Sequence, residues 1–283
     1  YRVIKMEGMR KLEKILARAG VVGGVAAVCW TIFKNTNVTY NFWSSENVKE
    51  WDFNWDRRDP ECMISPKAKR MANNTGGEND YNTLIDKCKA KAVRHLFLVR
   101  HGQYNLAGKC DTERVLTNLG VTQARLTGER LKDLGFPFSI IIQSSMTRAK
   151  ETAAEISKSL PLPLKTCSLL CEGAPFPAIP EHKHWHPMNQ IYQDSARIEA
   201  AFRKYFHRAD PSQKLDSYEI IVAHANVIRY FVCRALQFPP EGWLRMSLHH
   251  ASITWISILP SGKVTMKCLG DSGHLPTDKM TTS

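Results

Sequence analysis

Five side chains in the later part of this 283-residue chain have types that are suited to phosphoryl transfer. Arginine binds anionic oxygens through a planar fork, a neutral imidazole can attack phosphorus, and a carboxylic acid can protonate a leaving oxygen and then activate water. Each of the five follows an apolar segment of strand-like length, near the point where that segment ends. They are Arg100, His101, Arg148, Glu172 and His224. This combination indicates a reaction in which a histidine carries the phosphoryl group.

Taken one at a time, these residues also have structural interpretations. Arg100-His101 could be a surface pair, Glu172 could be an acid in any loop, and His224 could be a core histidine with satisfied hydrogen bonds. The functional interpretation therefore depends on their joint position at strand ends. The chain has no glycine-rich phosphate cradle and no obvious carboxylate cluster, so neither a metal nor a cofactor is predicted.

Strands and helices alternate in the predicted phosphatase domain, residues 91–283, which indicates an α/β fold with a largely parallel sheet. Strands are predicted over 95–99, 138–142, 164–170 and 218–223, with a hairpin over 252–259 and 264–269. Helices are predicted over 118–134, 146–158, 191–208 and 226–237, the first with Thr117 as its N-cap. Ligands of open α/β sheets bind outside the carboxyl ends of the strands, which is where the five polar residues would meet.

The net charge of +12, from 39 basic and 27 acidic side chains, is spread along the chain without a basic run. Because nucleic-acid binding usually shows a clustered basic face, no nucleic-acid partner is predicted, and an anionic substrate is the better explanation of the charge. The 8 cysteines form no CxxC pair, so we expect free thiols in a reducing compartment rather than zinc or a disulfide frame.

The N-terminal part, residues 1–34, combines a basic segment with an apolar one. Residues 19–33 carry no charged side chain. As a helix they would reach about 22 Å, short of a hydrocarbon core of roughly 30 Å. Arg18 and Lys34 could extend to the headgroups at either side. A single-pass membrane anchor is the favoured interpretation, and a cleaved secretory signal and a buried helix are the alternatives.

Residues 35–90 lack clear periodicity and are predicted to be a linker, with flexible stretches at 65–67 and 73–79. Within it lies the six-residue Trp-Asp segment, Trp51-Asp52-Phe53-Asn54-Trp55-Asp56. Three aromatic side chains in a polar linker are costly to leave in water, so the segment should dock either on the following domain or on another subunit. The second alternative predicts an oligomerisation motif.

The motifs of the domain resemble those of the histidine phosphatase, or phosphoglycerate mutase-like, superfamily. The matching segments are 98–102, 116–120 with Gln123-Ala124, 144–149, 172–173 and 223–224, which together span most of the predicted domain. The resemblance implies a three-layer αβα fold with a mostly parallel sheet. It also implies that His101 is the phosphorylated nucleophile, that Arg100, Arg148 and His224 form the phosphate pocket, and that Glu172 is the acid.

One branch of the superfamily, the mitochondrial serine/threonine-protein phosphatases, is more similar still. The membrane segment, the Trp-Asp segment and the stretch 233–243 carry this closer likeness. It implies phosphorylated proteins as substrates and self-association driven partly by the Trp-Asp segment. It also implies a single-pass location in a mitochondrial membrane, with the outer one favoured.

Two departures from the superfamily pattern bear on the substrate. Residues 103–108 lack the acidic and Trp-containing stretch with which glycolytic mutases grip a small sugar phosphate, which disfavours a mutase. Cys171 stands where the family often has an arginine before the acid. The insertion after Glu172 is too short for a large cap, so an open site for a phosphorylated protein is expected. The alternative hypotheses are an oligomeric scaffold with secondary catalysis and a small-molecule phosphomonoesterase or mutase.

Overall fold

The computed structural model of the chain describes residues 50–283, except for 76–77, 182–185 and 283. The predicted anchor, residues 1–34, and the first part of the predicted linker lie outside these residues. Contacts group Trp51–Ser283 into one unit. Among the described residues, no helix is both long and apolar enough to cross a membrane.

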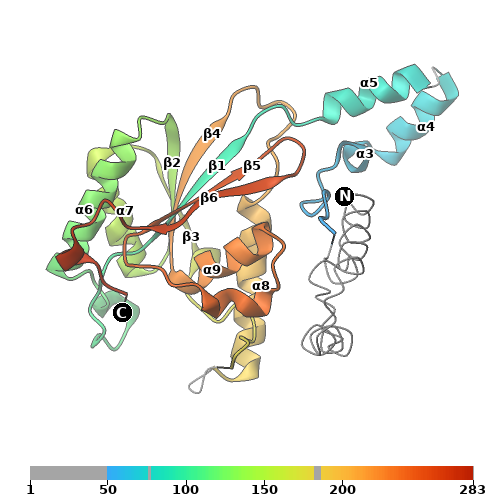
Figure 1. Ribbon diagram of the computed structural model, residues 1–283. Helices are drawn as coiled ribbons and strands as arrows, with labels where there is room; N and C mark the ends of the chain where they lie inside the picture. The colour runs from blue at the N-terminus through green and yellow to red at the C-terminus, as the bar shows by residue number, and fades with distance from the viewer. Residues whose placement is uncertain (1–49, 76–77, 182–185, 283) are drawn as a thin grey trace, which may run out of the picture. The chain divides into compact units, whose positions relative to one another are not determined.

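A six-stranded mixed sheet with the strand order β3-β2-β4-β1-β5-β6 forms the centre of the fold (Figure 1). The strands are β1 (Arg94–Arg100), β2 (Phe138–Ser144), β3 (Leu164–Cys167), β4 (Ser217–Ala223), β5 (Ile253–Ile258) and β6 (Val264–Asp271). The first four strands pair in parallel, and β5 and β6 add an antiparallel hairpin beside β1. The predicted α/β class and the terminal hairpin are therefore confirmed.

Helices cover both faces of the sheet, which gives three layers (Figure 1). They are α6 (Asn118–Asp133) and α7 (Thr147–Ser159) on one face, and α8 (Met188–Tyr205) and α9 (Ala225–Ala235) on the other. Strand β1 supplies both cores because its side chains alternate. Leu96 and Leu98 belong to the cluster with α8 and α9, and Phe97 and Val99 belong to the opposite cluster. All four are at most 1% exposed, so β1 is central.

Helix α6 begins as predicted, because the side chain of Thr117 accepts a hydrogen bond from the backbone N–H of Gly120. The linker prediction is different. Three helices form there, α3 (Pro60–Met63), α4 (Pro66–Thr75) and α5 (Glu78–Cys88). Glu78 and Asp80 begin α5 and Lys87 lies in its last turn, which matches the helix dipole at both ends. These end signals outweigh the polar composition that suggested flexible chain.

The third strand is shorter than predicted. Strand β3 ends at Cys167, and Ser168–Leu170 form one turn of 3-10 helix rather than continuing the strand. Leu170 is fully buried, so the turn is fixed by the core. The apolar residues of a buried turn and of a strand cannot be told apart by their pattern, which explains the error.

Candidate active site

The five predicted site residues lie at one edge of the sheet, because β1, β2 and β4 run parallel and end together. Arg100 is the last residue of β1 and His101 follows it. Arg148 lies in the first turn of α7, after β2. His224 is the N-cap residue of α9, directly after β4. Glu172 follows the turn after β3.

His101 is buried, with 2% of its surface exposed. Its Nδ1 lies 2.8 Å from the carbonyl oxygen of Gly102. Because a carbonyl oxygen accepts hydrogen bonds, Nδ1 carries the ring proton and Nε2 keeps its lone pair. Nε of Arg148 donates to this Nε2 at 3.3 Å. Burial, together with His224, Arg148 and Arg100, holds the pKa of His101 well below its ordinary value, so its imidazole is neutral.

Arg100 and Arg148 bring two buried guanidinium groups to His101. Nη1 of Arg100 donates to the carbonyl oxygens of Leu248, at 2.6 Å, and Thr282, at 2.8 Å. Burial lowers the pKa of Arg100 to about 10, so it stays charged at neutral pH. The guanidinium of Arg148 lies 4.7 Å from the ring centroid of Tyr104. Cation–π contacts of this kind hold a buried arginine in place without using its hydrogen-bond donors.

Asp111, from the loop after the nucleophile, holds the start of α7. Its Oδ2 accepts hydrogen bonds from the backbone N–H and the hydroxyl of Thr147, at 3.0 and 2.9 Å. Its Oδ1 lies 3.8 Å from Nη1 of Arg148, an ion pair that is longer than a hydrogen bond. The carboxylate therefore orients the residue that precedes Arg148 and leaves most of the arginine's charge available.

His224 and Glu172 complete the site. The ring centroids of His224 and His101 are 5.1 Å apart, and Nε2 of His224 lies 2.9 Å from Oγ of Ser144. Burial and the nearby arginines hold the pKa of His224 well below its ordinary value. Burial raises the pKa of Glu172, against a hydrogen bond from the backbone N–H of Gly173 at 3.1 Å. A carboxyl group with a raised pKa is suited to donating a proton.

Three buried nitrogens of the site have no hydrogen-bond partner in the described part of the chain. They are Nε of Arg100, Nη1 of Arg148 and Nδ1 of His224. A buried polar group without a partner is costly, and nearly all such groups in proteins are satisfied by protein, water or ligand. Three of them at one place, two of them cationic, are suited to binding an anion that offers several oxygens.

The backbone around Glu172 is clamped by residues that sequence reasoning missed. Arg197 of α8 donates to the carbonyl oxygens of Cys171, at 2.5 Å, and Glu172, at 3.1 Å. Asp194 forms an ion pair with Arg197 at 2.7 Å. Asn226 of α9 donates to the carbonyl oxygen of Gly173 at 3.1 Å. The three-residue spacing of Asp194 and Arg197 indicates a helical pair, but nothing in the sequence connects that pair to Glu172.

The missing cation at Cys171 is partly offset from another helix. Sγ of Cys171 lies 3.0 Å from Oγ of Ser145 and supplies no charge. Burial lowers the pKa of Arg229, on α9, while the carboxylate of Glu172 raises it. Arg229 is therefore close enough to the acid to interact with it electrostatically. The prediction that one cation is absent at residue 171 stands, although the pocket is less depleted of positive charge than the sequence indicates.

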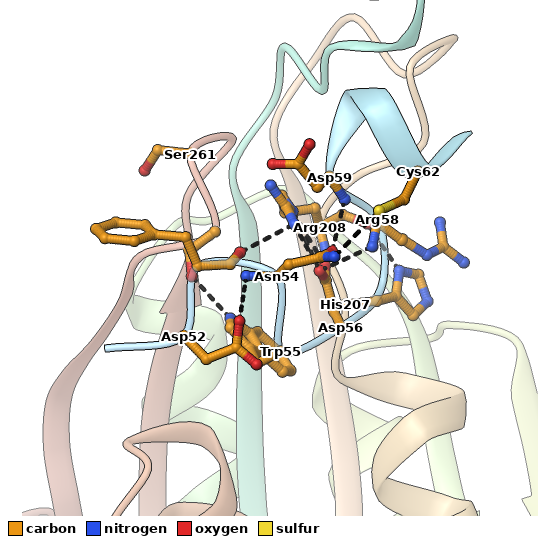
Figure 2. Close-up of polar contacts among 12 residues, drawn as sticks. Asp52, Asn54, Trp55, Asp56, Arg58, Asp59, Cys62, His207, Arg208 and Ser261 are labelled. Carbon is orange, nitrogen blue, oxygen red and sulfur yellow. Dashed lines mark hydrogen bonds and ion pairs between the residues drawn. The ribbon is translucent and has the colours of Figure 1, made fainter. Parts of the chain in front are cut away.

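The Trp-Asp segment docks on the domain that follows it (Figure 2). Trp51 and Trp55 are partly buried and pack against the core cluster of α8 and α9. Nε1 of Trp55 donates to the carbonyl oxygen of Gly262 at 2.8 Å. Asp56 forms a buried ion pair with Arg208 at 2.8 Å. Intrachain docking, one of the two alternatives from the sequence, is therefore realised in the structure.

The remaining residues of the segment are polar connections and one outward side chain. The backbone N–H and carbonyl oxygen of Asp52 bond the side-chain amide of Gln237, both at 2.9 Å. Oδ1 of Asn54 accepts from the backbone N–H of Asp59 at 3.0 Å. Phe53 is 56% exposed. The predicted role of these residues in self-association stays a prediction. In the described ranges, no group of three or more His, Cys, Asp or Glu side chains is placed to hold a metal ion.

Comparison with known proteins agrees with this geometry. Residues 96–271 match the family described as the histidine phosphatase superfamily, branch 1. The mitochondrial serine/threonine-protein phosphatase PGAM5 of Rattus norvegicus is 49% identical over 283 residues, covering 95% of this chain and 97% of that protein. The protein of the same name from Homo sapiens is 54% identical over 235 residues, covering 82% of this chain and 80% of the relative.

A solved structure supports the fold. A candidate alpha-ribazole-5'-P phosphatase from Escherichia coli superimposes with a TM-score of 0.50 and 21% identity, covering 63% of this chain and 97% of its own. At this identity the likeness concerns the fold alone. The predicted family and the hydrolase class that it entails are confirmed by the family match and the relatives: the chain belongs to the histidine phosphatase superfamily.

Proposed function

We propose that this chain is a protein serine/threonine phosphatase that acts through a phosphohistidine at His101. The observation that carries the proposal is a neutral imidazole with a free Nε2 lone pair, surrounded by three buried nitrogens without partners. That arrangement combines a nucleophile with an oxyanion site. The relatives at 49% and 54% identity, which are named as serine/threonine-protein phosphatases, support the substrate class.

In the first step, Nε2 of His101 attacks phosphorus, and the bond from phosphorus to the serine or threonine oxygen breaks. Glu172, whose raised pKa favours the protonated form, gives its proton to that leaving oxygen. Arg100, Arg148 and His224 donate to the equatorial oxygens, which carry the negative charge. The products are a free hydroxyl side chain, a phosphohistidine and a Glu172 carboxylate.

In the second step, the Glu172 carboxylate takes a proton from a water molecule as that water attacks phosphorus. The bond from phosphorus to Nε2 breaks, the electron pair returns to the imidazole, and inorganic phosphate leaves. His101 is neutral again and Glu172 is protonated, so the cycle closes. Nucleophile, acid, base and cations are all side chains, so the route needs no metal.

The mechanism is tested by trapping the intermediate. With 32P-labelled p-nitrophenyl phosphate, a good leaving group reduces the need for the acid, so Glu172→Gln should form the intermediate and then hydrolyse it slowly. Labelled protein should accumulate, with the label on His101. The double variant with His101→Ala is the matched control and should stay unlabelled. Label retained in that control, or wild-type phosphate release by His101→Ala, would show that another residue is the nucleophile.

The substrate class is tested separately, because a small-molecule phosphomonoesterase or mutase is the competing hypothesis. Rates are compared for phosphoserine and phosphothreonine peptides and for a panel of sugar phosphates at equal concentration. Faster release from the peptides supports a protein phosphatase. Faster turnover of one sugar phosphate would replace that substrate with a small molecule and leave the role of His101 intact.

A mitochondrial location with a membrane anchor at residues 19–33 is the second part of the proposal. The relatives carry "mitochondrial" in their names, and the uncharged stretch with basic flanks supports the anchor. Fractionation of cells that express the full chain should place it with mitochondria, and alkaline carbonate should not extract it. Access of added protease to intact mitochondria reports whether the outer membrane holds it. A variant without residues 19–33 should be extracted freely, and retention of that variant would refute the anchor.

Self-association through the Trp-Asp segment is the third part, and it underlies the competing scaffold hypothesis. The segment presents Phe53 outward while Trp55 and Asp56 hold it on the domain. Phe53→Ala should therefore lower the mass measured by light scattering without changing the melting temperature. A fall in phosphatase rate with the mass would link assembly to catalysis. An unchanged mass would remove Phe53 from any interface, and partner capture that survives loss of catalysis would favour a scaffold.

A further inference from the structure

The buried residue His250 lies beside the candidate pocket and has no part in the mechanism above. Its side chain is 1% exposed, and its ring centroid is 5.5 Å from that of His101. Nε2 of His250 lies 3.1 Å from Nη2 of Arg100, and Nδ1 lies 2.9 Å from Oγ1 of Thr281. The ring therefore connects a pocket arginine to the segment Lys279–Thr282.

The contact with Arg100 fixes the tautomer of His250. A guanidinium group can donate hydrogen bonds but cannot accept them, so Nε2 of His250 is the acceptor and Nδ1 carries the proton. Nδ1–H then donates to the hydroxyl oxygen of Thr281. Burial and the charge of Arg100 lower the pKa of His250 to about 3, so the ring is neutral at physiological pH. Each nitrogen thus has one defined role.

The hydroxyl of Thr281 also reaches the other side of the nucleophile. Its oxygen accepts from Nε2 of Gln123 at 2.9 Å, and Oε1 of Gln123 accepts from the backbone N–H of Gln103 at 2.9 Å. Gln123 is fully buried. Hydrogen bonds consequently run from Arg100, which precedes the nucleophile, to Gln103, which follows it, through one threonine side chain.

The backbone of Lys279–Thr282 adds three contacts to the same groups. The carbonyl oxygen of Thr282 accepts from Nη1 of Arg100 at 2.8 Å, and that of Lys279 accepts from Nε2 of Gln123 at 2.6 Å. The carbonyl oxygen of Thr281 accepts from the backbone N–H of His250 at 2.8 Å. These bonds occupy Nη1 and Nη2 of Arg100. Its Nε has no partner in the described residues and stays available to an anion.

We propose that Lys279–Thr282 is a latch that holds Arg100 and the nucleophile loop in the geometry that binds phosphate. His250 and Thr281 are its positioning residues, and neither touches the reacting atoms. The proposal rests on the assignment of Arg100 to phosphate binding under the proposed function. It assigns to a segment about 180 positions away in sequence a share of the pocket's affinity, because unlinked guanidinium groups lose orientation and bind oxyanions less well.

The test measures the affinity of the full 283-residue chain for orthovanadate, a mimic of the phosphoryl group in transfer, by titration calorimetry. Thr281→Val keeps the side-chain shape and removes the hydroxyl, and His250→Phe keeps a ring and removes both nitrogens. Each should weaken vanadate binding about three- to tenfold, the worth of one or two ordinary hydrogen bonds. Thr281→Ser and His250→Gln restore the needed groups and should bind within about twofold of wild type.

The controls separate positioning from folding. His249→Ala removes the neighbouring histidine, whose Nδ1 contacts Ser272 and not Arg100, and should leave vanadate affinity unchanged. A merely structural role for the latch would lower the melting temperature and leave the affinity of the folded protein intact. Nitrogen-15 chemical shifts should show His250 protonated at Nδ1 in wild type, and Thr281→Val should disturb that signal.

Wild-type vanadate affinity in both Thr281→Val and His250→Phe would overturn the latch, provided that Arg100→Ala binds weakly. Wild-type affinity in Arg100→Ala itself would overturn the pocket assignment and the latch together. Failure of the chain to dephosphorylate peptides would refute the proposed substrate and not the latch, because vanadate binding is measured without turnover.

Discussion

Arg208 and Arg100 are both almost fully buried, at 2% and 8% exposed, but they differ in what they hold. Arg208 meets both oxygens of Asp56 and the carbonyl oxygen of Phe53, at 2.8 to 3.3 Å (Figure 2). Arg100 meets only neutral acceptors, and its Nε has no partner in the described chain. One buried cation has its anion within the chain, and the other is held in place without one.

The difference separates a structural arginine from a functional one without reference to relatives. A buried cation costs several kcal/mol unless an anion accompanies it. At the Trp-Asp segment Asp56 is that anion. Burial raises the pKa of Asp56, but the hydrogen bonds and charge of Arg208 outweigh it and the pKa falls below its ordinary value. At the sheet edge, Arg100 and Arg148 lie together around His101, and the matching anion must come from outside the chain.

Replacing Arg208 should have the largest effect on stability. Arg208→Met leaves the carboxylate of Asp56, whose side chain is 0% exposed, buried without its cation. Removing one partner of a buried pair typically costs about 3–5 kcal/mol. Urea unfolding should show this loss, while the folded fraction keeps its phosphatase rate. The double variant with Asp56→Leu should recover most of the stability, and a single variant as stable as wild type would contradict the structural role.

Replacing Arg148 should have the opposite signature. Arg148→Met removes a buried nitrogen without a hydrogen-bond partner, so the melting temperature should stay the same or rise. Loss of one donor to the developing charge should lower the rate of peptide dephosphorylation about a hundred- to a thousandfold. Arg203→Met, at a solvent-exposed pair on α8, is the control and should change neither quantity measurably. A strong loss of stability in Arg148→Met would mean that its cation is structural.

The sheet-edge pocket was predictable because strand ends and residue types appear directly in the sequence. Parallel pairing then places the ends together, as Arg100 opposite Ala223 in neighbouring strands shows. Glu172 was predictable as well, although the strand before it ends three residues early. The fold class and four of its helices followed from periodicity for the same reason.

What could not be predicted depends on contacts between distant segments. Nothing in the pattern around Thr281 or His250 indicates that they meet Arg100, since the hydrogen bonds join positions far apart in sequence. The choice between intrachain and intersubunit docking of Trp55 was equally open, because aromatic composition indicates burial and not the surface that provides it. The helices of the linker were missed because weak propensity was outweighed by end effects and packing.

The two regions should also differ in their response to pH. Burial lowers the pKa of the pocket histidines His101, His224 and His250 in the folded state. Below about pH 6.5 the unfolded chain therefore binds more protons than the folded one, and stability falls as the pH drops. Each histidine contributes up to about 1.4 kcal/mol per pH unit. The raised pKa of Glu172 acts in the opposite direction, because its contribution is lost as the pH rises.

Urea unfolding at pH 7.5, 6.5 and 5.5 measures this slope. Stability should be highest at pH 7.5 and fall at each step, and His250→Gln should flatten the fall by the share of one histidine. The ion pair of Asp56 titrates far below this window and should add nothing to it. Equal stability at pH 7.5 and 5.5 would mean that the pocket histidines become protonated without unfolding the chain.

The smallest effect contrasts two tryptophans within the Trp-Asp segment. Nε1 of Trp55 donates to the carbonyl oxygen of Gly262, whereas the buried Nε1 of Trp51 has no partner in the described residues. Trp55→Phe should therefore cost about 1–2 kcal/mol in urea unfolding, and Trp51→Phe, an equal change in size, should cost less or stabilise the chain.

The same pair of variants extends the rule drawn from the arginines to self-association. A buried donor without a partner inside the chain marks a place where something external can bind, and for Trp51 a second copy would be that partner. Trp51→Phe should then lower the mass measured by light scattering with the melting temperature unchanged, while Trp55→Phe should change the melting temperature first. If neither variant alters the mass, the unpartnered donor of Trp51 is a tolerated local cost, and the rule holds for the cations of the pocket alone.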